Sequence, residues 1–247
     1  AFAVDPKQAA YRLCQAGYPY LAISAHGSTM GDAIGRGEMF ETTAAFITPT
    51  SVSKGEVCVN VTRVAGIDPR NSAALSGAMV ELSRQVEMSR TFLKASIPGF
   101  AHSEISYIAH RVGVRETGRI VGEQTLTQDE VVNGMEQPNS IARGAHHVDI
   151  HGRGKEQIRI PVRNGGSYGI PFGCLIPVEL RNVLAAGRCL SSDRGANGSA
   201  RVMGTCLATG QAAGVAAAIF TDGELENTRD IPIRLLQERL TQRGACL

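Results

Sequence analysis

The sequence predicts a mixed α/β (α+β) protein, and three observations lead to that prediction. The run Glu56–Val64 is rich in β-branched residues and alternates polar and apolar side chains, as a strand does. The segment Ser72–Ser96 repeats apolar residues near helical spacing and stops before Pro98. The last third of the chain places a short apolar run before a polar loop and a helix of small residues. Together these elements predict helices packed on a mixed sheet.

Further elements follow from local signals along the chain. Short strands are expected at Ile105–Ile108, Arg115–Gly122 and Val148–His151, joined by polar loops such as Thr127–Glu130. Asp230 followed by a proline in the first turn predicts a final helix that stops at Gly244. That helix is expected to be structural.

Composition limits the classes of protein and partner. The chain has 247 residues, 43% hydrophobic and 19% charged, so it can bury a full core and is neither disordered nor collagen-like. Its net charge of +2 predicts no attraction to nucleic acid or to an anionic membrane. The longest nearly apolar run, Leu207–Phe220, falls short of the ~20 residues that span a bilayer.

The cysteines predict the cellular compartment of the protein, and the first residue indicates how the chain is processed. Six cysteines are scattered without a Cys-x-x-Cys pair, so neither a zinc knuckle nor a dithiol motif is expected. Reduced cysteines and the lack of an apolar secretion segment predict a cytoplasmic protein. Because the chain opens at Ala1, a processed or truncated product is expected.

Glycine is concentrated in one stretch of the chain, since ten of the 28 glycines lie between Gly165 and Gly214. There, Val183–Gly187 is expected to be a short buried strand, Arg188–Arg201 a polar loop and Val202–Phe220 a helix. A stripe of small residues would let that helix pack closely on a sheet, and it comprises Gly210, Ala213, Gly214 and Ala217. Three further glycines would let a planar ligand approach the main chain: Gly195, Gly198 and Gly204. A strand, turn and helix of this kind are typical of half a nucleotide-binding crossover. A packing motif without a ligand is the alternative.

A second cluster lies at His146–His151, with the sequence HHVDIH. On a strand, His147, Asp149 and His151 share one face. These residue types could hold Zn²⁺ or Fe²⁺, although no further ligand motif accompanies them. A structural polar face is the other interpretation that the pattern allows.

Four segments resemble the FAD-dependent oxidoreductases related to glutathione reductase, and more narrowly the family called FAD-dependent oxidoreductase. Tyr168–Phe220 is similar to the carboxyl-terminal part of those proteins. Cys58–Asp68, Gly113–Val131 and Ile141–Gly152 resemble earlier segments, in the same order. The likeness covers residues 56–220.

The resemblance implies a domain organisation. Residues 1–176 would form a substrate-side mixed sheet with helices, and residues 177–220 the returning strand, loop and helix of a Rossmann-like FAD/NAD(P)-binding domain. Residues 221–247 would add a C-terminal helix.

The resemblance also implies a cofactor site for FAD. Six residues would contact it, the first three near the ribityl chain and diphosphate and the last three near the flavin ring: Gly187, Arg188, Asp193, Val202, Met203 and Gly204. A helix N-terminus would stabilise the negative charge that reduced flavin gains at its N1–C2=O edge. Arg188 stands where more distant relatives place an acidic ribityl ligand.

The implied reaction is hydride transfer between a small organic substrate and flavin N5. A histidine near the flavin would act as the base for the substrate hydroxyl. His151 is the first candidate for that catalytic role, and His147 is the second.

A fingerprint of the family is absent, since no GxGxxG turn occurs in these residues. The sequence therefore predicts the C-terminal portion of a longer enzyme, or one chain of a split one, which alone would hold FAD weakly or not at all. Its partners would be a small-molecule substrate and the missing FAD-binding segment or a companion chain, with a homo-oligomer left open. Two alternatives stand: a flavin-free structural or complementing subunit, and a metal-dependent enzyme using His147, Asp149 and His151.

Overall fold

The computed structural model describes residues 21–247 apart from 52, 153 and 155. The chain divides into two compact units, which we describe separately. One comprises the residues up to Gly113 together with Gly152–Gln157, and the other comprises Val114–His151 and Ile158–Leu247. Cys14 lies outside the described residues. The boundaries expected at residues 176 and 220 stay predictions.

The described part of the first unit is an antiparallel sheet with the strand order β1-β2-β3, together with helices α2 and α3. Met30 and Ala33, from α2, are buried in its core. The strand expected from Glu56 is confirmed, although its ladder ends at Asn60. The elements are β1 (Leu21–Ser24), α2 (Ser28–Gly35), β2 (Ala44–Ser51), β3 (Glu56–Asn60) and α3 (Ser72–Ser96).

The helix predicted over Ser72–Ser96 is confirmed as α3 with the same bounds. Asn71 caps it, because the side-chain oxygen accepts two main-chain N–H groups of the first turn. Of the apolar residues that give the helical spacing, Leu93 is buried, whereas Met79 is 46% exposed. Gln85 is also buried, and its amide exchanges hydrogen bonds of 2.8 and 2.9 Å with the main chain of Arg63.

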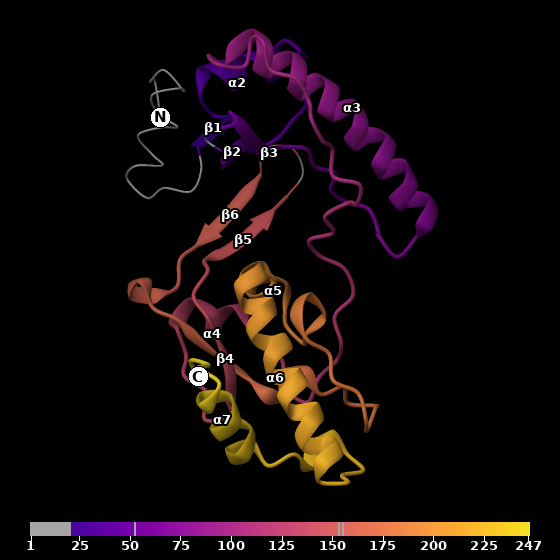
Figure 1. Ribbon diagram of the computed structural model, residues 1–247, viewed down its shortest axis with the longest axis vertical. Coiled ribbons are helices and arrows are strands. Elements are labelled where there is room, and N and C mark those ends of the chain that lie inside the picture. Colours follow the sequence, from indigo (N-terminus) through magenta and orange to yellow (C-terminus); the bar gives the residue numbers. More distant parts are fainter. Residues whose placement is uncertain (1–20, 52, 153, 155) are drawn as a thin grey trace. The chain divides into compact units, whose positions relative to one another are not determined.

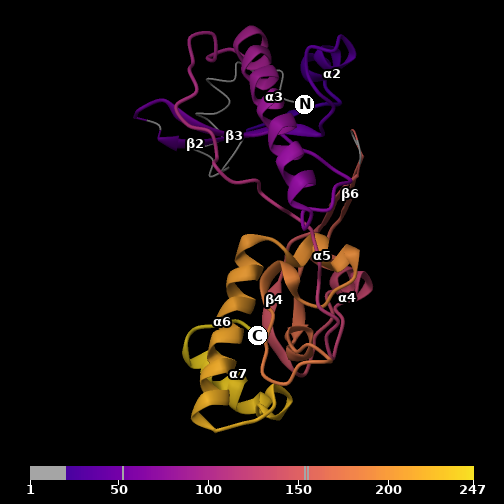
Figure 2. The ribbon, with the colours of Figure 1, turned by 90° about the vertical axis from the view of Figure 1, so that its right-hand side faces the viewer.

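The second unit packs helices on two small sheets, which confirms the mixed α/β class. β4 pairs antiparallel with β7, and β5 pairs with β6. The two helices nearest the C-terminus lie beside β4 in both views (Figures 1 and 2). The elements are α4 (Gln128–Asn133), β4 (Ser140–Gly144), β5 (Val148–His151), β6 (Gln157–Ile160), β7 (Tyr168–Pro171), α5 (Arg194–Ala200), α6 (Met203–Asp222) and α7 (Ile233–Gln242).

Three short strands are expected in the middle of the chain, and two of these predictions are wrong. Ile105–Ile108 forms no ladder, and Arg115–Gly122 forms only an isolated bridge at Gly122. Their alternating patterns lack a neighbouring strand, within the described residues, with which to exchange main-chain hydrogen bonds. Val148–His151 is confirmed as β5. The loop expected at Thr127–Glu130 is instead a capping box that starts α4.

The prediction of a returning strand for the Rossmann-like crossover is also wrong. Val183–Gly187 is exposed or half-buried and forms no strand. The N–H of Ala185 donates to the main-chain oxygen of Leu175, but this bond does not continue as a ladder. The loop expected at Arg188–Arg201 contains α5, whose N-cap is Asp193. The predicted helix that follows is confirmed as α6.

The small-residue stripe of α6 faces away from the core, contrary to expectation. Gly210, Gly214 and Ala217 are exposed, and a Cβ added at either glycine would meet nothing within 4 Å. The opposite face is buried against β4 and α7, with the side chains of Thr205, Thr209, Ala212, Val215, Ala216 and Ile219. By length and composition α6 is the one described helix that could cross a membrane, and a core helix passes the same test.

The C-terminal helix is confirmed as α7, with Leu236 and Leu240 fully buried. Asp230 is not its cap, because it lies in a preceding 3-10 turn and the helix begins after Pro232. Gly244 follows the helix in the left-handed conformation, with φ of +80°, as expected for a glycine that ends a helix.

Candidate functional site

Strand β5 brings an imidazole and a carboxylate together. Asp149 and His151 are two residues apart, so their side chains share a face. The Nε2 atom of His151 lies 2.9 Å from Oδ2 of Asp149, which is only 9% exposed. A buried carboxylate bonded to one ring nitrogen orients the imidazole for proton transfer. The expected common face is therefore confirmed for these two residues.

His147 does not join this pair. It precedes β5, and its ring stacks on His146 with the centroids 4.0 Å apart. Burial lowers the pKa of His147, and His146 lowers it further, so the neutral ring is favoured. The structure brings no three His, Cys, Asp or Glu side chains together as metal ligands among the residues it describes. The alternative of a metal site at His147, Asp149 and His151 therefore finds no support in the described residues.

Two arginines that sequence reasoning did not single out converge on Asp149. The Nε atom of Arg159, on β6, lies 3.5 Å from a carboxylate oxygen of Asp149. Arg201, at the junction of α5 and α6, donates to the main-chain oxygen of Asp149 at 2.6 Å. Burial lowers the pKa of Arg201. The only sequence signal for Arg201 is its position directly before a helix start.

Glycines hold α5 tightly on its neighbours. A Cβ added at Gly198 would lie 3.1 Å from the main-chain oxygen of Asp149 on β5. A Cβ added at Gly195 would overlap the side chain of Gln128. The expectation that Gly195 and Gly198 face a planar ligand is therefore wrong, because both glycines are used for packing. Gly204 differs, since a Cβ there would meet nothing within 4 Å.

The predicted ribityl contacts begin at a turn that is held by α5 and α6. Gly187 has φ of +73°, which favours glycine, and its N–H donates to Thr209 of α6 at 3.1 Å. Arg188 is exposed, and its carbonyl accepts from the Asn197 side chain at 3.2 Å. The roles of Gly187 and Arg188 toward a cofactor stay predictions.

Asp193 connects two helices through its carboxylate. Oδ1 accepts the N–H of Ala196 at 2.7 Å, which caps α5. Oδ2 accepts the N–H of Gln128 at 2.8 Å, at the start of α4. Its contact with a ribityl chain or diphosphate stays a prediction, and its structural role is clear from these bonds.

Replacing Asp193 with alanine is expected to lower the free energy of unfolding by about 2 kcal/mol, because a helix cap and a second main-chain acceptor are lost together. Urea denaturation measures the change. Asp222, an exposed residue at the end of α6, offers a matched control whose replacement by alanine should change stability by less than about 0.5 kcal/mol. Equal stabilities of the two variants would contradict this role for Asp193.

The N-terminus of α6 is open to solvent. Val202 is the N-cap residue and its side chain makes no capping hydrogen bond, and the first turn carries no acidic residue. Met203 is 82% exposed. The free N–H groups of the first turn and the positive end of the helix dipole suit an anionic group at Val202, Met203 and Gly204.

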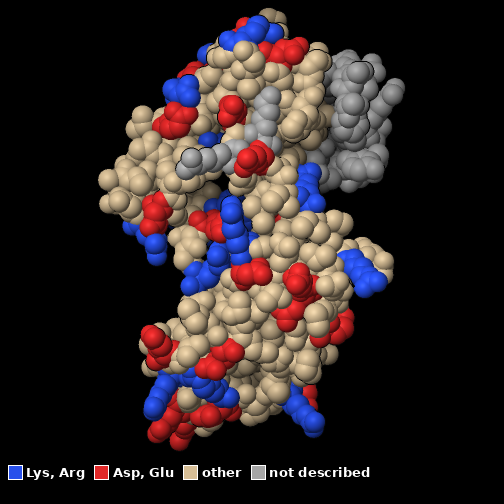
Figure 3. Space-filling model, turned by 180° about the vertical axis from the view of Figure 1, so that it is seen from behind, with Lys and Arg blue, Asp and Glu red and all other residues tan. Residues whose placement is uncertain are grey.

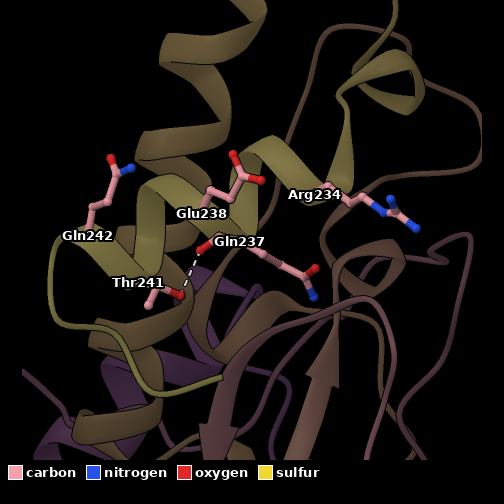
Figure 4. A pocket seen from close by; sticks show the side chains of 5 residues that line it. All are labelled: Arg234, Gln237, Glu238, Thr241 and Gln242. Carbon is pink, nitrogen blue, oxygen red and sulfur yellow. Dashed lines mark hydrogen bonds between the residues drawn. The ribbon is translucent and has the colours of Figure 1, made fainter.

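Two surface pockets among the described residues contain none of the predicted site residues. The first is a shallow depression on α7, where Thr241 bonds to the main-chain oxygen of Gln237 (Figure 4) and the Gln237 side chain donates to the main-chain oxygens of Pro138 and Ser140. The second lies beside the Glu123–Arg229 ion pair. The candidate site therefore rests on the groups around Asp149 and α6.

The fold and these groups define a mixed α/β protein that presents an oriented imidazole and an anion-favouring helix end. A model of the family described as FAD dependent oxidoreductase matches residues 8–240. The chain belongs to this family, which gives it a general role as a flavin oxidoreductase. Comparison with curated proteins gave no match, and comparison with solved structures gave none either.

Proposed function

We propose that this chain forms the substrate-side and flavin-contacting part of an oxidoreductase that transfers hydride between a small organic substrate and flavin N5. One observation carries the proposal. The open N-terminus of α6 directly follows Arg201, which bonds to Asp149, and Asp149 orients His151. An anion-favouring helix end and an oriented base therefore belong to one connected structure.

The residues of this region fit the cofactor that the family implies. Val202, Met203 and Gly204 would hold the N1–C2=O edge of the flavin through their main-chain groups, because Met203 is exposed and a Cβ added at Gly204 would meet nothing within 4 Å. Gly187, Arg188 and Asp193 are the proposed neighbours of the ribityl chain and diphosphate. Bound FAD would supply the acceptor for hydride.

The side chains of the chain itself would handle the proton. His151 would take the hydroxyl proton of the substrate while the adjacent C–H bond gives up its hydride. Asp149 would hold the ring in position and stabilise its protonated form. His147 is a weaker candidate, because its buried Nε2 has no recorded partner among the described residues and its lowered pKa disfavours protonation.

The proposal includes a partner, either an FAD-binding segment or a companion chain that carries a GxGxxG turn. The exposed stripe of α6 supports it, because Gly210 and Gly214 would allow another element to pack closely. A flavin-free complementing subunit would use the same stripe. On the face drawn in Figure 3, basic and acidic side chains are interspersed, which supports the proposal that neither nucleic acid nor an anionic membrane is a partner.

Titration with FAD tests the proposal, with flavin absorbance and fluorescence as readouts. The 247-residue chain is expected to bind weakly or not at all, and a form extended by the upstream residues of its gene is expected to retain the yellow chromophore. In that form, Gly204→Val should weaken FAD binding at least tenfold, because a β-branched side chain would block the approach to the first turn. This minimum corresponds to about 1.4 kcal/mol.

Gly77→Val, on an exposed position of α3 where an added Cβ also meets nothing within 4 Å, is the matched control and should leave FAD binding unchanged. A colourless extended form would overturn the proposed function and favour the flavin-free subunit. Unchanged binding by Gly204→Val would remove Gly204 from the site.

A further inference from the structure

Arg201 is a half-buried guanidinium that bonds to a carbonyl oxygen instead of a carboxylate. Its terminal nitrogen donates to the main chain of Asp149 at 2.6 Å. Among the described residues, no Asp or Glu oxygen lies within 4 Å of its nitrogens. Removing a cation from water without a counter-charge is costly, so such an arginine is suited to an anion that arrives from outside.

The carboxylates near Arg201 already have partners. Asp149 is bonded to His151 at 2.9 Å and lies 3.5 Å from Arg159. The charge of Asp149 also acts on Arg201, but this one carboxylate lies near two guanidinium groups, those of Arg159 and Arg201. Its single negative charge therefore does not compensate both.

Glu116, the other carboxylate of this region, is also engaged. Its oxygens lie 3.1 Å from Arg119 and 3.9 Å from Arg194. Arg115, the residue before it, is exposed and forms no ion pair that is recorded among the described residues, and its charge repels that of Arg201. The region around Asp149 therefore has more positive than negative charge, which favours an anionic ligand.

We infer that Arg201 binds the carboxylate of an organic acid and so places its substrate beside His151. This inference rests on the proposed function, because it names the substrate class of the same site. For a hydroxy acid the chemistry balances. The O–H proton would go to His151, bound FAD would accept the C–H hydride, and a C=O bond would form to give an oxo acid. An arginine fork matches the two oxygens of the carboxylate, which stays unchanged.

Binding of two small molecules to the 247-residue chain, without flavin, tests the inference directly. Lactate and its neutral analogue lactamide differ only at the carboxylate. Calorimetry is expected to show lactate binding at least tenfold more tightly than lactamide. The NMR signal of the His151 ring, assigned by comparison with His151→Gln, should shift with lactate and stay in place with lactamide. Equal affinities for the two compounds, or no binding of lactate, would overturn the inference.

Variants test the assigned arginine. Arg201→Met should weaken lactate binding tenfold to a hundredfold, because a charge-assisted hydrogen bond is lost, while Arg201→Lys should weaken it less. Arg194→Met, which removes an exposed arginine near Glu116, should leave binding unchanged. Equal losses in Arg201→Met and Arg194→Met would overturn the role of Arg201. If Arg201→Met does not fold, the lysine variant and the NMR signal of the unmodified chain still test whether Arg201 binds the carboxylate.

The remaining outcomes separate the substrate class from the proposed function. Sulfate that binds as tightly as lactate would indicate a general anion site and overturn the assignment of a carboxylate. Lactate binding that depends on Arg201, in a protein that never binds FAD in the titrations above, would support the organic-acid site and overturn the flavin-dependent function. FAD binding without lactate binding would support the flavin-dependent function and overturn the organic-acid site.

Discussion

His151→Gln is expected to lower the rate of flavin reduction by substrate at least a hundredfold while FAD binding stays within about twofold. The magnitude follows from the loss of a general base that is already oriented by a buried carboxylate. Glutamine keeps hydrogen-bonding capacity at this position, although it takes up no proton. The loss should therefore appear in the rate of hydride transfer, measured by the decrease in flavin absorbance after rapid mixing.

A matched control makes this result specific to the base. His110→Gln removes an exposed histidine that bonds to Tyr107, and it should leave the rate unchanged. A rate for His151→Gln within threefold of the unmodified enzyme would exclude His151 as the base and leave His147 as the candidate.

Gly144→Ala is expected to lower the free energy of unfolding strongly. Gly144 pairs directly with Tyr168 across β4 and β7, and the tyrosine ring covers the glycine so closely that an added Cβ would overlap it. The ring cannot move away easily, because Tyr168 is 0% exposed and its hydroxyl lies 2.7 Å from Ser199 Oγ. Overpacking of this kind costs about 3 kcal/mol of unfolding free energy.

Chemical denaturation of three variants measures this effect. Gly118→Ala, at an open position of the same unit, should change stability by no more than about 0.5 kcal/mol. Combining Gly144→Ala with Tyr168→Leu should be less destabilising than the sum of the two single changes, because the smaller side chain relieves the overlap. Additive effects, or a Gly144→Ala variant as stable as Gly118→Ala, would show that the ring accommodates the methyl group.

Burial of Tyr168 also has an electrostatic consequence. It raises the pKa of the phenol to about 12 even though the bond with Ser199 acts in the opposite direction. The hydroxyl therefore stays neutral at physiological pH. Tyr168 connects strand β7 to the C-terminal end of α5, which leads directly to Arg201 and the N-terminus of α6.

The elements that were predicted correctly depend on local signals. Helix α3 was placed with its bounds from apolar spacing and a following proline, and α7 from its proline start and terminal glycine. Strand β5 was found from four residues, and its alternation correctly put Asp149 and His151 on one face. Such features are determined within one or two turns of chain.

The elements that were predicted wrongly depend on partners far away in sequence. Arg115–Gly122 and Val183–Gly187 have strand-like composition, yet neither obtains a ladder in the described fold. Strand formation requires a neighbour to accept its hydrogen bonds, and composition does not state whether that neighbour is present. The same limit explains why the small-residue stripe of α6 was expected to be buried and is exposed.

By itself, the sequence determined the mixed α/β class, the positions of the long helices, the family and the two residues His151 and Asp149 on one strand face. Only the tertiary structure decided that His147 stands apart, that Asp193 is a helix cap and that Arg201 meets Asp149 without a carboxylate of its own. The physical reason is distance along the chain. Arg201 is separated from Asp149 by 52 residues, so its hydrogen bond forms only when α5 packs on β5, which Gly198 allows.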